Sequence, residues 1–305
     1  MEFHLFPLFA LLLVLEGINS SLLPAEVYWR SKLPNTPLPK ALQDLLKPAA
    51  DERKKITYSF SEDAVGARIC YEISYWEKMT KISNQNSIPS NTTTIFFLQD
   101  DLLPGKKMKL AFTKSTNGSN FLPREIAESI PFSTNKLSEI LNHFSINPRS
   151  KEAEIMKITI EECEAPNVRG QDKYCATSLE SLVDFAIGKY GKNVEAVLNE
   201  AEEENESQEY TILKGIIMVG EEQIVCHRER YVYAVFYCHT IKFTKVYSIS
   251  MVGEDGSKAK AIVVCHTDTS AWSPKHYAFQ VLKVKPGGPP ICHFLNDDAI
   301  VWVPY

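Results

Sequence analysis

The sequence has few of the features that mark common enzyme and membrane classes. It contains no Gly-rich phosphate loop and no Ser-His-Asp signature, and nothing in it indicates a nucleotide cofactor. The formal net charge of −5 and the pI of about 5.9 give nucleic-acid binding no support. After Leu15 no apolar run reaches the length of a membrane helix, so we expect a mature chain without a membrane span.

One apolar run stands at the N-terminus, from Leu5 to Leu15, and only Pro7 interrupts it. It is too short to span a bilayer and has the length of a signal-peptide core. Small or polar residues follow, which predicts a signal peptide over residues 1–20 with cleavage near Ser20. The mature protein is then secretory, and three glycosylation sequons are consistent with that route, at Asn91, Asn117 and Asn205.

Residues 21–91 predict a variable, largely unstructured leader and linker. Proline occupies three of the six positions from Pro34 to Pro39, which argues against regular structure there. The composition turns polar from Ala49 to Ser90, and Ser83–Ser87 resembles a linker. The domain proper is therefore expected over residues 92–305.

Periodicity changes along this domain. Apolar residues recur at helical spacing from Leu137 to Phe144, and again from Leu179 to about Gly188 after a capping box at Thr177–Glu180. The acidic run 199–206 is typical of a solvated loop. Alternation and short apolar runs then predict strands at 210–213, 231–237, 240–252, 259–264, 278–284 and 300–303. Helices followed by strands indicate an α+β domain, with the helices of its N-terminal half packed on a mainly antiparallel β core.

Seven cysteines in a secretory chain favour disulfides. Cys163 and Cys175 flank a loop that a disulfide could close. Cys70 is the odd residue, either a free thiol or an intermolecular partner. Four further cysteines allow three pairings, and the sequence does not choose among them: Cys226, Cys238, Cys265 and Cys292.

Each of these four cysteines is followed directly by a histidine, at His227, His239, His266 and His293. Each Cys-His dipeptide ends a short apolar run, which predicts four similar strand ends. Neighbouring residues of a strand face opposite sides, so the sulfurs are expected on one side as disulfides or buried thiols. The four imidazoles would lie on the other side, where they could bind copper or zinc. The alternative is that the histidines only cap strand ends.

The spacing of these dipeptides, CH-x10-CH-x25-CH-x25-CH, together with the terminal Ala299–Pro304, resembles the plant BURP domain. The resemblance begins at Thr94–Phe97 and Asp101–Gly105 and continues through three further motifs: Phe121–Arg124, Ile130–Ser133 and Cys175–Ser181. It implies one of two functions. Some BURP proteins resemble non-enzymatic proteins of seeds, seed coats, cell walls and stress responses, including the polygalacturonase β-subunit. Others are copper-dependent peptide cyclases that crosslink Tyr or Trp side chains, in their own chain or in another.

A missing aromatic residue favours the non-enzymatic reading. Some self-cyclising relatives carry a Tyr-containing core after a Phe-Thr-Lys segment, whereas here Phe112-Thr113-Lys114 runs into Ser115–Asn120, which has no aromatic residue. The expectation is therefore a secreted protein of the extracellular space or cell wall, or alternatively of the vacuole, with a histidine copper site. Its partner would be a cell-wall component, or a peptide if the protein is a cyclase. The sequence does not indicate the oligomeric state.

Overall fold

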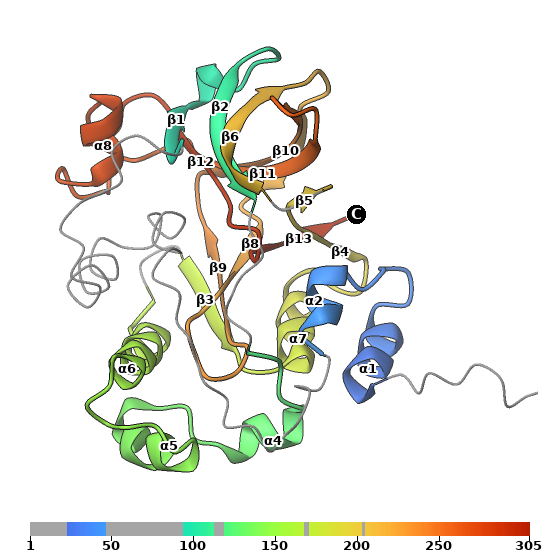
Figure 1. The fold of residues 1–305 in the computed structure, drawn as a ribbon, viewed down its shortest axis with the longest axis vertical. Helices are drawn as coiled ribbons and strands as arrows, with labels where there is room; N and C mark the ends of the chain where they lie inside the picture. The colour runs from blue at the N-terminus through green and yellow to red at the C-terminus, as the bar shows by residue number, and fades with distance from the viewer. Residues whose placement is uncertain (1–22, 47–93, 113–118, 168–170, 203–204) are drawn as a thin grey trace, which may run out of the picture.

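The computed structural model describes residues 23–46, 94–112, 119–167, 171–202 and 205–305 (Figure 1). Two antiparallel sheets lie at its centre. The predicted α+β class is confirmed, with most helices N-terminal to most strands. The helices are α1 (Pro24–Lys32), α2 (Lys40–Asp44), α4 (Arg124–Ser129), α5 (Leu137–His143), α6 (Lys151–Glu164), α7 (Leu179–Tyr190) and α8 (Tyr277–Leu282), with 3-10 turns η2 (Gln99–Asp101) and η3 (Thr134–Lys136).

The five-stranded sheet has the order β3-β9-β8-β13-β4. Each pair of neighbours is antiparallel. The C-terminal strand β13 lies inside this sheet, between β8 and β4. Its strands are β3 (Gln171–Ala176), β4 (Val194–Val197), β8 (Ile224–Arg228), β9 (Phe236–Ile241) and β13 (Ile300–Pro304).

The eight-stranded sheet has the main path β1-β12-β11-β10-β6-β2, with β5 paired to β11 and β7 paired to β10. It curls strongly, as the ring of strands at the top of Figure 1 shows. The backbone N–H of Thr94 donates to the carbonyl of Lys109 at 2.6 Å, which ties the chain entering β1 to β2 at the opposite edge. Its strands are β1 (Phe96–Leu98), β2 (Lys107–Phe112), β5 (Glu200–Ala201), β6 (Asn205–Ile212), β7 (Ile217–Glu221), β10 (Thr244–Gly253), β11 (Lys258–His266) and β12 (Ile291–Phe294).

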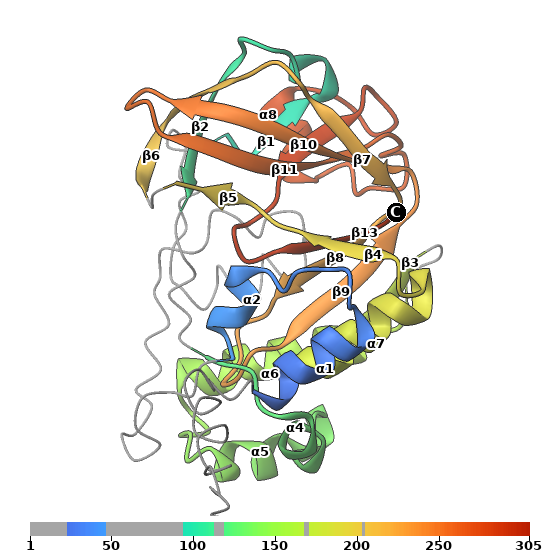
Figure 2. The same cartoon turned by 90° about the vertical axis from the view of Figure 1, so that its right-hand side faces the viewer.

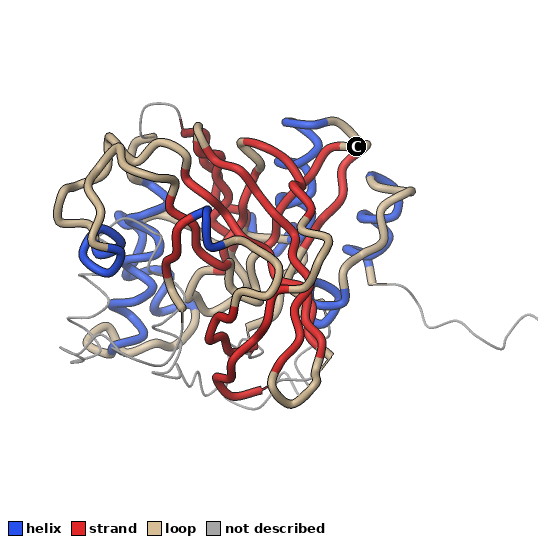
Figure 3. The backbone as a smooth tube through the Cα atoms, turned by 90° about the horizontal axis from the view of Figure 1, so that it is seen from above, coloured by secondary structure: helices blue, strands red, loops and turns tan. Residues whose placement is uncertain are grey.

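Helices α1, α2 and α7 cover the face of the five-stranded sheet that points away from the eight-stranded sheet (Figure 2). Seen from above, the strands run through the middle of the molecule and helices lie at their sides (Figure 3). Three apolar clusters follow from this layering. One lies between the helices and the five-stranded sheet, one lies between the two sheets, and one fills the inside of the curled sheet.

Helix α7 begins at Leu179, where the apolar stripe begins in the sequence, but its cap differs from the predicted one. Ser178 is its N-cap and accepts a hydrogen bond from the N–H of Ser181 at 3.1 Å, so the predicted capping box at Thr177–Glu180 is wrong by one position. The helix also continues past Gly188 to Tyr190. It ends at Gly191, whose φ of 78° lies in a region that residues with a side chain rarely adopt.

One predicted strand is wrong, and another, predicted over 231–237, is right only for its last two residues. Residues 278–284 contain helix α8 rather than a strand, because a short apolar run does not fix its own period and His276 caps a helix here. Residues 231–235 precede β9 without being part of it. Tyr231 and Tyr233 pack instead against the cluster formed with α5 and α6.

The leader also differs from the expectation of a largely unstructured segment. Within it, α1 and α2 are helical, and Trp29, Leu33 and Leu42 are each 1% exposed. The remainder of the leader and linker, including Cys70, lies outside the described residues. The acidic run is likewise not only loop, because β5 and the start of β6 lie within it.

Candidate metal centre

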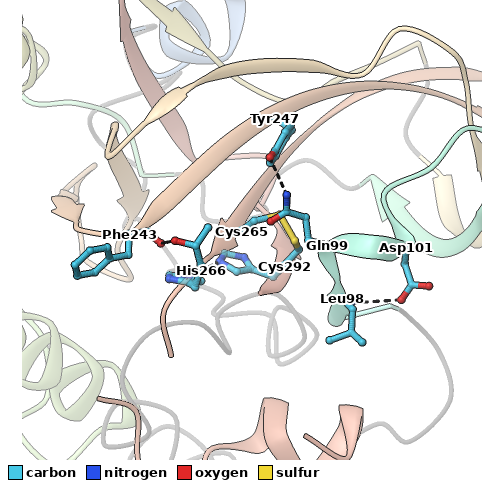
Figure 4. The surroundings of a disulfide bond; sticks show 10 residues. Leu98, Gln99, Asp101, Phe243, Tyr247, Cys265, His266 and Cys292 are labelled. Atoms are coloured by element: carbon cyan, nitrogen blue, oxygen red, sulfur yellow. Dashed lines mark hydrogen bonds between the residues drawn. A yellow bond between two sulfur atoms is a disulfide. The ribbon is translucent and has the colours of Figure 1, made fainter. Parts of the chain in front are cut away.

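Strand register places the cysteines of the four dipeptides in two directly opposed pairs. Cys226 lies opposite Cys238 on β8 and β9, and Cys265 lies opposite Cys292 on β11 and β12. Both pairs are disulfides, as Figure 4 shows for Cys265–Cys292. This result selects one of the three pairings that the sequence left open.

The third disulfide, Cys163–Cys175, joins the end of α6 to β3. It closes the loop for which the sequence suggested a disulfide. The predicted set of six disulfide cysteines is thus complete in the structure.

The sulfurs point away from the space between the sheets. Cys226 and Cys238 belong to the cluster under the helices, whereas Cys265 and Cys292 belong to the cluster inside the curled sheet. All four cysteines are 0% exposed. Since neighbouring side chains of a strand face opposite sides, the adjoining histidines must project into the layer between the two sheets.

Strand neighbours of the histidines confirm this direction. Val225 shares a face of β8 with His227, and Val264 shares a face of β11 with His266. Both valines belong to the apolar cluster between the sheets. The imidazoles therefore extend this inter-sheet layer. Only His266 ends its strand, whereas the other three dipeptides lie within β8, β9 and β12, so the expectation of four strand ends holds for one of them.

Within each sheet the two histidines occupy diagonal positions of adjacent strands. His227 lies opposite Tyr237, two residues before His239 on the same face. His266 lies opposite Ile291, two residues before His293. Diagonal neighbours are within reach of ring side chains. The Nε2 atoms of His227 and His239 are 3.3 Å apart, and those of His266 and His293 are 3.4 Å apart.

Burial keeps three of these imidazoles neutral. It lowers the pKa of His239 to about 3 and that of His293 to about 4, and it holds the pKa of His266 well below the usual value. Electrostatic repulsion lowers the pKa further, because a protonated ring would repel a second protonated ring beside it. His293 lowers the pKa of His239 in this way, and His293 and His239 both lower that of His266. His239 stands on the five-stranded sheet, whereas His266 and His293 stand on the eight-stranded sheet. Since these rings interact electrostatically, the two pairs lie within electrostatic reach of each other.

A hydrogen bond fixes the tautomer of His293. Its Nδ1 lies 3.0 Å from the carbonyl oxygen of Phe294, which only accepts, so Nδ1–H is the donor. The Nε2 atom of the neutral ring is then unprotonated, and it faces Nε2 of His266 at 3.4 Å. Histidine ligands of metals are commonly oriented in this way by a backbone carbonyl on the other ring nitrogen.

The spacing of each pair fits a metal ligand set. Zinc binds imidazole nitrogen at about 2.0–2.1 Å, and a tetrahedron with such bonds has edges of about 3.3–3.4 Å. The two Nε2 distances have this length. Imidazole nitrogens suit copper equally well. In the described part of the chain, however, the residues form pairs, and no three His, Cys, Asp or Glu side chains gather closely enough to share one ion.

Comparison with known proteins identifies the family of this chain. The BURP-domain family model matches residues 95–304, which include all four dipeptides. This chain belongs to the BURP-domain family. It is 49% identical to BURP domain protein RD22 of Arabidopsis thaliana over 218 residues, which are 69% of this chain and 56% of RD22.

Two other relatives of this BURP protein align over most of both chains. BURP domain-containing protein 5 of Oryza sativa subsp. japonica is 40% identical over 94% of this chain and 88% of its own. Protein RAFTIN 1B of Triticum aestivum is 33% identical over 91% and 89%. By contrast, the chain spans only about half the length of RD22 and of BURP domain-containing protein 3, 56% and 50%.

Aromatic rings that the sequence did not single out surround the imidazoles of this BURP domain. The Tyr237 ring lies 5.5 Å from His239, and the half-buried Trp272 ring lies 4.9 Å from His266. Trp272 also packs on His276 at 4.4 Å. The Nδ1 atom of His276 accepts the N–H of Ala278 at the start of α8.

The remaining predicted sites are only partly described. Asn205 stands at the start of β6, whereas Asn91 and Asn117 lie outside the described residues. His143 is exposed on α5 and packs on Phe144, away from the dipeptides. None of the helices of the described residues is long and apolar enough to cross a bilayer.

Proposed function

We propose that this chain is a secreted BURP protein that binds copper through His227, His239, His266 and His293 and acts by association rather than by catalysis. The two histidine pairs, which among the described residues do not lie close enough to share an ion, would have to draw together to hold one copper ion. Its setting would be the seed, the seed coat, the cell wall or a stress response. The observation that supports the copper site is the pair of Nε2–Nε2 distances, 3.3 and 3.4 Å, between rings of which His239, His266 and His293 are buried. The apolar run Leu5–Leu15 supports secretion.

Several properties of the layer suit a metal. His239, His266 and His293 are neutral at physiological pH, so no proton has to leave before they ligate. The disulfides prevent the cysteine sulfurs from competing as ligands. Bound copper would supply a positive charge, and a redox centre, between the two sheets.

Metal analysis tests this proposal. The protein is produced through a eukaryotic secretory pathway, loaded with copper and dialysed. We expect one copper ion per chain, lost in His266→Ala and retained in the exposed control His143→Ala. Stoichiometric copper in His266→Ala would contradict a four-imidazole site. Immunolocalisation that confines the protein to the cytosol would contradict the secreted role.

An oxidative peptide cyclase is the second candidate, and the ring of Trp272 beside His266 favours it. This contact shows that an aromatic side chain can stand 4.9 Å from one of the proposed ligands. Mass spectrometry with and without copper and oxygen distinguishes the candidates. A cyclase removes two hydrogens for each crosslink, in its own chain or in an added Tyr- or Trp-containing peptide, whereas a binding protein leaves both masses unchanged.

A further inference from the structure

Residues 23–46, here called the docked segment, lie against the helix side of the five-stranded sheet. Ala25, Trp29 and Leu33 follow the spacing i, i+4, i+8 and are 9%, 1% and 1% exposed. Trp29 packs on Trp302 of β13 with 5.7 Å between the ring centroids. This is how an amphipathic helix lies in a groove of a partner protein.

Polar contacts fix the position of the docked segment. The indole N–H of Trp29 donates to the carbonyl of Thr36 at 2.8 Å, so the segment satisfies its own buried donor. The Thr36 hydroxyl then donates to the carbonyl of Val194 on β4 at 2.6 Å. The proline-containing turn between Trp29 and Thr36 thus places both buried side chains where their polar groups are hydrogen-bonded.

A second set of contacts lies at the rim. The Tyr28 hydroxyl donates to the carboxylate of Asp184 on α7. Arg124 of α4 donates to the same carboxylate at 2.7 Å, and its guanidinium lies 5.0 Å from the Tyr28 ring centroid. The Asp184–Arg124 ion pair belongs to the domain itself, and Tyr28 joins it from outside.

The docked segment is attached almost entirely through side chains. Within the described residues it pairs with no strand. Its one backbone–backbone hydrogen bond to the rest of this part of the chain runs from the N–H of Phe121 to the carbonyl of Leu45, at 2.8 Å. Departure of the segment would therefore break no sheet ladder. The residues that match the family begin only at position 95.

We infer that the surface formed by α7, β4 and β13 is a peptide-binding groove, and that residues 23–46 are its intramolecular ligand. The groove takes a short helix with a tryptophan anchor and an adjacent tyrosine, followed by a Pro-rich turn. Trp302 forms its floor, and Asp184 with Arg124 forms its rim. This site is on the opposite face of the five-stranded sheet from the imidazoles.

A peptide added in trans tests the groove. The full mature chain is prepared unchanged and as Trp29→Ala, which removes the anchor of its own segment. A fluorescently labelled peptide of residues 21–46 is titrated into each, with anisotropy as the readout. We expect saturable binding to the Trp29→Ala chain and at least tenfold weaker binding to the unchanged chain, because its own segment occupies the groove.

Matched peptides and a rim variant sharpen the test. A peptide with Trp29→Ala should bind roughly 30-fold more weakly, as expected for a buried aromatic anchor. A peptide with Val27→Ala should bind normally, because Val27 is 51% exposed. Asp184→Ala added to the Trp29→Ala chain should weaken binding of the unchanged peptide, since Tyr28 loses its acceptor.

Two results would overturn the inference. One is a Trp29→Ala chain that unfolds cooperatively yet takes up no peptide, or takes up the two matched peptides equally. The other is a Trp29→Ala chain without any cooperative unfolding transition, because residues 23–46 would then be part of the core and not a ligand of it.

Discussion

Acidification should destabilise the metal-free protein well above the pH at which its carboxylates titrate. In the unfolded chain, His239 and His293 take up protons below their ordinary pKa of about 6.5. In the folded protein their pKa values are about 3 and about 4, so both stay neutral. Their contribution to stability is therefore fully present above pH 6.5 and is lost as the pH falls.

The size of the loss follows from these pKa values. At pH 5 each of these imidazoles binds a proton in the unfolded chain but not in the folded protein, which stabilises the unfolded chain by about 2 kcal/mol per imidazole. Two such groups lower the free energy of unfolding by about 4 kcal/mol between pH 8 and pH 5. His266 acts in the same direction. This loss is a large part of the 5–15 kcal/mol that typically stabilises a domain.

Urea unfolding of the chelator-treated protein at pH 8, 6.5 and 5 measures the effect. The carboxylates with lowered pKa, such as Glu164 and Asp184, lose their contributions only below about pH 4.5 and do not enter this window. We expect the loss in His239→Leu to be smaller by about 2 kcal/mol, the share of one imidazole, and the exposed control His143→Ala to show all of it. A free energy of unfolding that changes by less than about 1 kcal/mol across the window would refute the buried, neutral imidazoles.

Three further predictions concern stability and use urea unfolding at pH 7. Replacing both Cys265 and Cys292 by Ala should cost about 3.5 kcal/mol, and replacing both Cys226 and Cys238 should cost about 3 kcal/mol, because the closed loops span 27 and 12 residues. Unchanged midpoints in both double variants would remove the stabilising role of the disulfides. Ser178→Ala should cost about 1 kcal/mol through loss of the α7 cap. An equal loss in Ser178→Gly would contradict a capping role, since glycine caps nearly as well as serine.

The direction of the Cys-His side chains was predictable from the sequence, whereas their pairing was not. Alternation along a strand separates Cys265 from His266 whatever the fold is. Which cysteine lies opposite Cys265 depends on the neighbour of β11, and that neighbour is set by tertiary packing. The division of the histidines into two pairs on two sheets likewise has no local signal.

The docked segment escaped prediction for a similar reason. Its prolines correctly indicate a turn without regular structure between Leu33 and Pro39. Its burial depends on Trp302, at the other end of the chain, and on Asp184 of α7. Helix α8 shows a different limit. The short run around Phe279 fits a strand as well as a helix, and the cap that His276 forms at its start favours the helix.

X-ray absorption at the copper edge, on protein purified from its native source, tests the central claim most directly. That claim is that disulfides hold the four sulfurs away from the layer in which the imidazoles bind the metal. We predict about one copper ion per chain, surrounded by nitrogen at about 2 Å with the scattering pattern of imidazole rings. Sulfur in the first coordination sphere, or native protein without copper, would contradict the account.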